Sequence, residues 1–152
     1  MRRVVLAGTF VVLGASVAFV QQGGPAPAHF HHVHVNATDP AKTQKFYEKT
    51  FGAQPVKFKD RTDALFTSRG FILINKVAES PKDLETTAIR HIGWAGVDGP
   101  NEFARLQDKG AQFHTALTPL GTNWFFYIFG PDREIAEIYT GDQNHLFNHV
   151  HF

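Results

Sequence analysis

Two stretches of the chain share one pattern of apolar and polar positions. Each begins with a histidine, continues as a β-type run and reaches an aspartate seven positions later, at 32–39 and at 91–98. A helical pattern follows each aspartate and ends at Gly-Ala-Gln, at 52–54 and at 110–112. These landmarks come in the same order at nearly equal spacing, which predicts an internal repeat.

Both predicted helices carry start and stop signals. Asp39 is placed to cap the first helix, and Pro40 follows at the first helical position, where its missing N–H costs nothing. Gly52 is suited to the left-handed conformation that ends a helix. Asp98 and Gly110 have the same places around the second helix. The alternative interpretation is two unrelated helices that are each well capped.

Short β-type runs follow each helix. They cover 56–59, 64–68 and 71–77 in the first half, and 113–118, 123–129 and 134–140 in the second. Each half therefore predicts a β-α-β-β-β module, spanning 29–86 and 87–142. The expected class is α+β, with two βαβββ modules forming a curved mixed sheet around an open cleft.

Alternation along the strands predicts which side chains line that cleft. In the first strand the valines are expected to pack against the helix, which places His32 and His34 on the open face. The same alternation places His91 there in the equivalent strand, and Glu137 and Tyr139 in the last strand. Because His32 and His91 are equivalent in the repeat, an approximate two-fold axis would bring them together.

Two imidazoles and one carboxylate make a ligand set for a divalent metal. We expect His32, His91 and Glu137 to hold the ion, with Fe(II) or Mn(II) favoured and Zn, Ni or Co as rivals. Such an ion, with open positions, can bind a bidentate small-molecule substrate and polarise its oxygens. Further candidates for contact with the substrate rest on residue type alone: His34, His114, Tyr127 and Tyr139. Of these, His34 and Tyr139 are predicted to act in catalysis.

Four segments carry a resemblance to a known family. They are 32–39, Lys-Phe-Tyr-Glu-Lys-Thr-Phe-Gly at 45–52, 91–98, and Phe-Gly-Pro-Asp at 129–132 with Ile-Ala-Glu-Ile at 135–138. With them the chain resembles the vicinal oxygen chelate superfamily, which includes glyoxalase I, extradiol dioxygenases and bleomycin-resistance proteins. The resemblance implies that the first-strand residue of each module and an acid in the final strand bind metal. Those positions match His32, His91 and Glu137, and Glu137 would also act in catalysis.

The chain also departs from parts of that family. Glyoxalase I typically has a fourth ligand, an acid in the last strand of the first module, whereas 71–75 here is Phe-Ile-Leu-Ile-Asn. The three-ligand set is therefore closer to extradiol dioxygenases. A lyase, isomerase or dioxygenase is expected, with non-catalytic sequestration of a small ligand as the alternative, because the fold alone does not decide activity. A homodimer is compatible with either function.

The residue composition is most informative at the N-terminus, where it predicts a targeting segment. Arg2 and Arg3 precede an uncharged stretch at 4–20 and a small-residue segment to 28, a pattern typical of a secretory signal cleaved after Ala18 or Ala28. The expected location is periplasmic or secreted, with a retained membrane anchor as the alternative. The net charge of +1, without basic runs, gives no case for binding nucleic acid.

The last residues repeat the opening of the first module. Phe-Asn-His-Val-His-Phe at 147–152 echoes Phe-His-His-Val-His-Val at 30–35. The tail at 143–152 therefore predicts either the start of a further module in a longer chain or an added edge strand.

Overall fold

The protein forms two sheets side by side, each with one helix. The computed structural model describes residues 30–60, 62–67, 69–82, 88–141 and 147–151, so the predicted signal at 1–28 lies outside the described residues. The first module consists of β1 (His32–Ala37), α1 (Pro40–Phe51), β2 (Gln54–Phe58), β3 (Thr62–Phe66) and β4 (Phe71–Lys76). The second consists of β5 (His91–Gly96), α2 (Gly99–Asp108), β6 (Gln112–Phe113), β7 (Thr118–Leu120), β8 (Asn123–Phe129) and β9 (Ile135–Thr140), and β10 (Phe147–His151) follows it.

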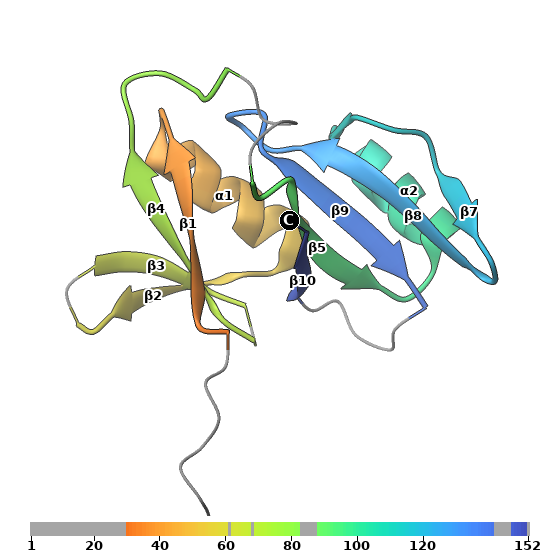
Figure 1. Ribbon diagram of the computed structural model, residues 1–152, viewed down its shortest axis with the longest axis horizontal. Helices are drawn as coiled ribbons and strands as arrows, with labels where there is room; N and C mark the ends of the chain where they lie inside the picture. Colours follow the sequence, from red (N-terminus) through yellow and green to blue (C-terminus); the bar gives the residue numbers. More distant parts are fainter. Residues whose placement is uncertain (1–29, 61, 68, 83–87, 142–146, 152) are drawn as a thin grey trace, which may run out of the picture.

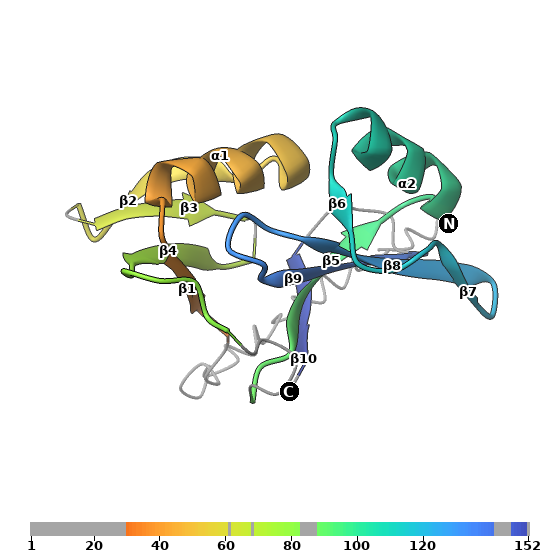
Figure 2. The same cartoon turned by 90° about the horizontal axis from the view of Figure 1, so that it is seen from above.

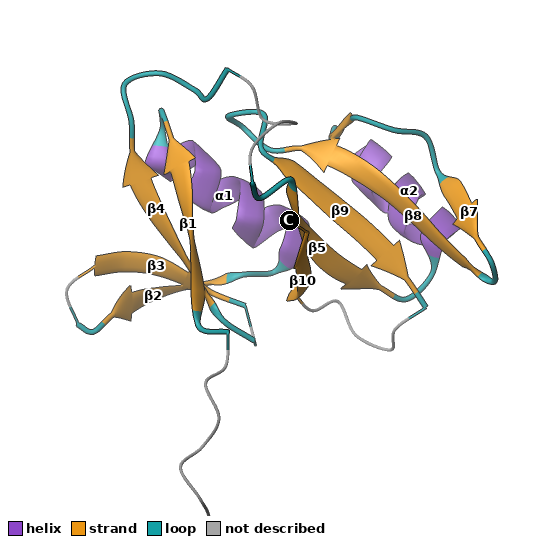
Figure 3. Ribbon diagram, in the orientation of Figure 1, coloured by secondary structure: helices purple, strands orange, loops and turns teal. Residues whose placement is uncertain are grey.

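Strand order confirms the predicted α+β class built from two similar modules (Figure 1; Figure 3). The first sheet has the order β1-β4-β3-β2, with β1 parallel to β4. The second has the order β10-β5-β9-β8-β6, with β5 parallel to β9. The first strand of each module thus pairs with the last strand of that module. The tail pairs antiparallel with β5, as an edge strand.

One predicted strand is interrupted. The run expected at 113–118 is instead two short strands, β6 and β7, which both pair with β8. The backbone amides of His114 and Thr115 both point to the carbonyl of Tyr127, at 2.8 and 3.4 Å. Two residues facing one partner is the geometry of a β-bulge, which breaks the ladder between the two short strands.

The predicted helix caps are confirmed. The Asp39 carboxylate accepts a hydrogen bond from the Lys42 amide at 3.1 Å, and Asp98 accepts one from Asn101 at 2.9 Å. Gly52 has a φ of 69°, the left-handed conformation that a C-terminal glycine adopts without steric cost. No helix in the described segments is long and apolar enough to cross a bilayer.

Both helices cover the same side of the two sheets (Figure 2). The core between helices and sheets is continuous across the modules, because the Phe51 ring of α1 stacks on Trp94 of β5 at 4.1 Å between centroids. Tyr47, Leu106 and Phe126 are fully buried in this layer. Within the described residues, the other side of each sheet carries no helix, as expected from the sequence.

A polar clasp also joins the modules. Asp132, in the turn between β8 and β9, accepts hydrogen bonds from the Thr38 amide at 3.1 Å, from the Thr38 hydroxyl at 2.6 Å and from the Ser80 hydroxyl at 2.6 Å. Thr38 and Ser80 follow β1 and β4 of the first module. Burial alone would raise the pKa of Asp132, but the hydrogen bonds from Ser80 and Thr38 outweigh it and lower the pKa.

Glu134 lies beside this clasp, and its pKa is shifted in the opposite direction to that of Asp132. Burial raises the pKa of Glu134 to about 7, against the lowering effect of backbone N–H donors that include the amide of Asp132. The Tyr47 hydroxyl lies 3.4 Å from its carboxylate. Glu134 is therefore a carboxyl group that the fold prefers to hold neutral.

Removal of the clasp should cost stability. Asp132→Ala is expected to lower the free energy of unfolding by about 2–4 kcal/mol, because hydrogen bonds to a buried charged group are lost together. Urea denaturation measures this change. Asp63→Ala is the matched control, since Asp63 forms an exposed ion pair with Lys57. This variant should change the free energy of unfolding by less than about 0.5 kcal/mol. Equal effects of the two variants would contradict the clasp.

Glu134 should make stability depend on pH. The pKa of Glu134 in the folded protein, about 7, lies above the ordinary 4.5. Its contribution to the stability of the folded state is therefore complete below pH 4.5 and is lost as the pH rises through about 7. Glu134→Gln stays neutral at every pH. Between pH 5 and pH 8 its free energy of unfolding should therefore fall by about 2–3 kcal/mol less than that of the wild type. Urea denaturation at both pH values tests this, with the exposed Glu79→Gln as control. Parallel pH profiles for the wild type and Glu134→Gln would refute the assignment.

Candidate functional site

A buried histidine–glutamate pair lies on the open face of the second sheet. The Nε2 atom of His91 lies 2.8 Å from a carboxylate oxygen of Glu137, and the two side chains are 0% and 9% exposed. Gly93 is the register partner of Glu137, and His91 lies two residues before it, so the two share one face. Ile92 and Ala136, their neighbours in sequence, pack into the helix-side core. The alternation predicted for β5 and β9 is confirmed.

The spacing of this pair suits two ligands of one ion. With metal–nitrogen and metal–oxygen bonds of about 2.1 Å, ligands at right angles lie about 3 Å apart. The observed 2.8 Å between His91 and Glu137 is compatible with that geometry. A borderline imidazole and a hard carboxylate are also the donor types of divalent transition-metal sites. These two residues therefore fit a divalent metal.

Tyr127 of β8 borders the pair. It is the register partner of Glu137, and its ring centroid lies 5.1 Å from that of His91. Burial raises the pKa of Tyr127, and the negative charge of Glu137 adds to the rise, while Arg90 lowers it in part. The phenol therefore stays protonated at neutral pH and can donate a hydrogen bond.

Arg90 was not predicted from the sequence. Its guanidinium lies 5.6 Å from the centre of the Tyr127 ring, within the range of a cation–π interaction. The residue precedes the predicted ligand His91 by one position, and that adjacency is the signal that could have identified it. It adds a positive charge at the margin of the site.

The first sheet carries a separate group of histidines. His32 and His34 lie on its open face and are exposed, as the alternation predicts, with ring centroids 5.1 Å apart. Nδ1 of His32 lies 2.9 Å from Nδ1 of His31, and Nδ1 of His34 lies 3.3 Å from the Asn75 side-chain oxygen.

The structure brings together two of the three predicted metal ligands. Among the side chains that it describes, no three His, Asp or Glu residues converge on a common point. His91 and Glu137 meet, and His32 is not grouped with them. The role of His32 as a ligand stays a prediction.

The other predicted site residues lie on several different elements. Tyr139 lies two residues after Glu137, and its phenol oxygen accepts a hydrogen bond from the Asn123 side chain at 2.9 Å. The His114 ring contacts Phe129, with centroids 4.8 Å apart. The catalytic roles predicted for His34 and Tyr139 remain predictions.

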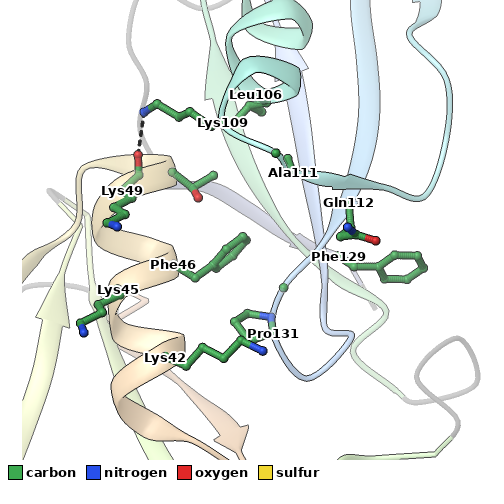
Figure 4. Close-up of a pocket in the computed structure, with 13 residues that line it drawn as sticks. Lys42, Lys45, Phe46, Lys49, Leu106, Lys109, Ala111, Gln112, Phe129 and Pro131 are labelled. Atoms are coloured by element: carbon green, nitrogen blue, oxygen red, sulfur yellow. Dashed lines mark hydrogen bonds between the residues drawn. The ribbon is translucent and has the colours of Figure 1, made fainter.

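A cavity of about 670 Å³ lies elsewhere, on the helix side of the molecule (Figure 4). Phe46, Leu106 and Phe129 contribute apolar surface to it, and four lysines also line it: Lys42, Lys45, Lys49 and Lys109. The Lys109 ammonium donates to the Lys49 carbonyl at 2.8 Å and joins α1 to the end of α2. None of the predicted metal ligands lines this cavity.

Comparison with known proteins identifies the family. Residues 29–138 match the model of the glyoxalase/bleomycin resistance protein/dioxygenase superfamily. The match covers well over half of the chain, and the chain belongs to this superfamily. A search of curated protein sequences gave no match.

Solved structures share the fold. The fosfomycin resistance protein FosX from Listeria monocytogenes superposes with a TM-score of 0.63 at 15% identity, over 77% of this chain and 96% of that one. Lactoylglutathione lyase from Agrobacterium tumefaciens superposes with a TM-score of 0.57 at 17% identity, over 77% of this chain and 96% of that one. A FosX mutant from Listeria monocytogenes was solved in complex with Mn(II) and 1S,2S-dihydroxypropylphosphonic acid. It superposes with a TM-score of 0.62 at 16% identity, over 77% of this chain and 93% of that one. At these identities the likeness shows a common fold.

Two variants should shift the Tyr127 pKa in opposite directions. Glu137→Gln removes a negative charge that raises this pKa, so the pKa should fall, whereas Arg90→Met removes a charge that lowers it, so the pKa should rise. NMR titration with ring-labelled tyrosine follows Tyr127 separately from the other two tyrosines. Shifts of the same sign in both variants would show that Tyr127 does not sense these charges.

Proposed function

We propose that this chain binds a divalent metal on the open face of its second sheet and acts there on a small substrate with adjacent oxygens. The buried contact between His91 and Glu137 carries the proposal. The reaction class is that of a metal-dependent lyase, isomerase or dioxygenase. Fe(II) or Mn(II) suits a set of two imidazoles and a carboxylate, with Zn, Ni and Co as rivals.

The residues at this site have distinct proposed roles. His91 and Glu137 would hold the ion, which when bound polarises substrate oxygens and stabilises developing negative charge. Tyr127, protonated at neutral pH, would donate a hydrogen bond to a substrate oxygen. Arg90, beside Tyr127, supplies a positive charge that favours an anionic substrate.

Relatives of the same fold support the metal and the substrate class. The FosX mutant complex contains Mn(II) and a dihydroxy phosphonic acid. Lactoylglutathione lyase, another relative of the same fold, is a lyase by name. Both support a small-molecule substrate for a site of this type.

A second imidazole completes the proposed two-histidine, one-glutamate set. His32 is the sequence's candidate, and since it is not grouped with the pair, it would come from a second copy in a homodimer. We also propose export to the periplasm or medium, on the basis of Arg2, Arg3 and the uncharged 4–20 stretch. Protein for metal analysis is therefore taken from those fractions.

Loss of either member of the pair should abolish metal binding. His91→Ala and Glu137→Ala are each expected to weaken Mn(II) or Fe(II) binding by more than about 100-fold, because even outer partners of metal ligands are worth about 10- to 100-fold. Elemental analysis of the purified protein and anaerobic calorimetric titration with each ion measure this.

His114→Ala is the matched control, since it removes a half-buried imidazole of the same module whose ring packs on Phe129. It should leave the metal content unchanged. A stoichiometric ion retained in His91→Ala would overturn the proposal. Metal-independent ligand binding without turnover would instead indicate a sequestering protein.

A further inference from the structure

The helix-side cavity lies between the two modules. One wall is α1 of the first module, and the other is formed by the end of α2, the start of β6 and the turn after β8 (Figure 4). Its volume of about 670 Å³ lies within the range of roughly 300–1,000 Å³ that is usual for small-molecule sites. A ligand in this cavity would therefore contact both modules at once.

The interior of the cavity is apolar. Figure 4 shows the half-buried ring of Phe46 extending from α1 into the cavity, towards the second module. Leu106, Ala111 and Pro131 of the second module line the cavity as well. Apolar surface of this kind binds hydrocarbon in proportion to the area that both remove from water. The surroundings therefore favour a ligand with an apolar body.

The charged side chains that line the cavity are all positive. Lys42, Lys45 and Lys49 are three and four residues apart, so they share one face of α1 with Phe46. Lys109 lies at the end of α2, where its ammonium donates to the Lys49 carbonyl. No aspartate or glutamate is among the described residues that line the cavity. Because the whole chain has a net charge of only +1, this positive charge is a local feature.

Helix stability accounts for two of these lysines. Lys49 and Lys109 lie at the C-terminal ends of α1 and α2, where a positive charge compensates the helix dipole. Lys42 lies in the first turn of α1, where a positive charge is unfavourable, and Lys45 lies four residues before Lys49, a spacing at which like charges repel.

Nor do carboxylates within the protein account for the other two lysines. Neither Lys42 nor Lys45 forms an ion pair in the part of the chain that the structure describes. Lys42 is near enough to Asp132 to lower the pKa of that carboxyl, but Asp132 accepts its hydrogen bonds from Thr38 and Ser80. The ammonium groups of Lys42 and Lys45 thus stay open to an anion from outside the chain.

We propose that this cavity binds a fatty-acid-like anion, with its carboxylate at Lys42 and Lys45 and its hydrocarbon chain against Phe46. The ammonium groups supply charge-assisted hydrogen bonds to the carboxylate, and the apolar interior covers the chain. Neither His91 nor Glu137 lines the cavity, so this site is separate from the proposed metal site. The bound ligand would tie the two modules together and stabilise the folded protein.

A series of saturated carboxylates tests the class of ligand. In calorimetric titrations of the full chain without added metal, affinity should rise about 2- to 4-fold for each CH₂ group added from hexanoate to decanoate. Octanol, which has no charge, should bind at least about 10-fold more weakly than octanoate. Equal affinities for octanol and octanoate, or affinities that do not depend on chain length, would overturn the proposal.

Paired lysine variants test the position of the carboxylate. Lys42→Met/Lys45→Met keeps the hydrocarbon stems but removes both charges, and should weaken octanoate binding by about 10-fold or more. Lys42→Arg/Lys45→Arg keeps the charges and should stay within about 3-fold of the wild type. The matched control Lys57→Met/Lys76→Met removes two exposed charges that do not line the cavity, and should also stay within about 3-fold. Equal losses in the two methionine variants would contradict the assignment.

NMR spectroscopy locates the ligand independently of the variants. Octanoate should shift the ring signals of Phe46 and the methyl signal of Ala111 saturably, because both side chains line the cavity. Saturable shifts that leave both residues unaffected would refute the site. Binding of the chain to anionic phospholipid vesicles, with no binding of free octanoate, would also refute it and would indicate a membrane-surface contact instead.

Discussion

The site depends on the alternation of side chains along two paired strands. Ile92 of β5 and Ala136 of β9 are buried beneath the helices, and this burial fixes the orientation of both strands. Apolar burial contributes about 25 cal/mol per Å², so a slip of one residue, which would turn both strands over, is strongly opposed. Core packing on one face therefore holds His91 and Glu137 in contact on the other.

Local chemistry was the part of the molecule that the sequence predicted well. Helix starts at Asp39 and Asp98 depend on a side chain and an amide three residues later, so they could be inferred without tertiary structure. The faces of His91 and Glu137 followed from alternation with apolar neighbours. The repeat then gave the class of fold, because each module buries its helix in the same way.

Contacts between distant segments were the part that could not be inferred. The clasp of Asp132 with Thr38 and Ser80, and the approach of Arg90 to Tyr127, depend on how strands and turns are arranged in space. The break between β6 and β7 arises from two amides that share one carbonyl, for which the sequence carries no distinct signal. The two-fold argument for His32 assumed an arrangement of the modules that no sequence pattern specifies.

Stability alone does not account for the buried pair of His91 and Glu137. Taking an imidazole and a carboxylate out of water costs several kcal/mol when they are charged, and replacing buried ion pairs with apolar residues is often neutral or stabilising by about 1–4 kcal/mol. On the helix-side face of the same two strands, Trp94 and Ile138 are almost fully buried apolar residues, so the polar pair contrasts with the rest of β5 and β9. A polar pair kept in this sheet, beside a protonated phenol and a guanidinium, fits the metal site that we propose better than a purely stabilising role in the fold.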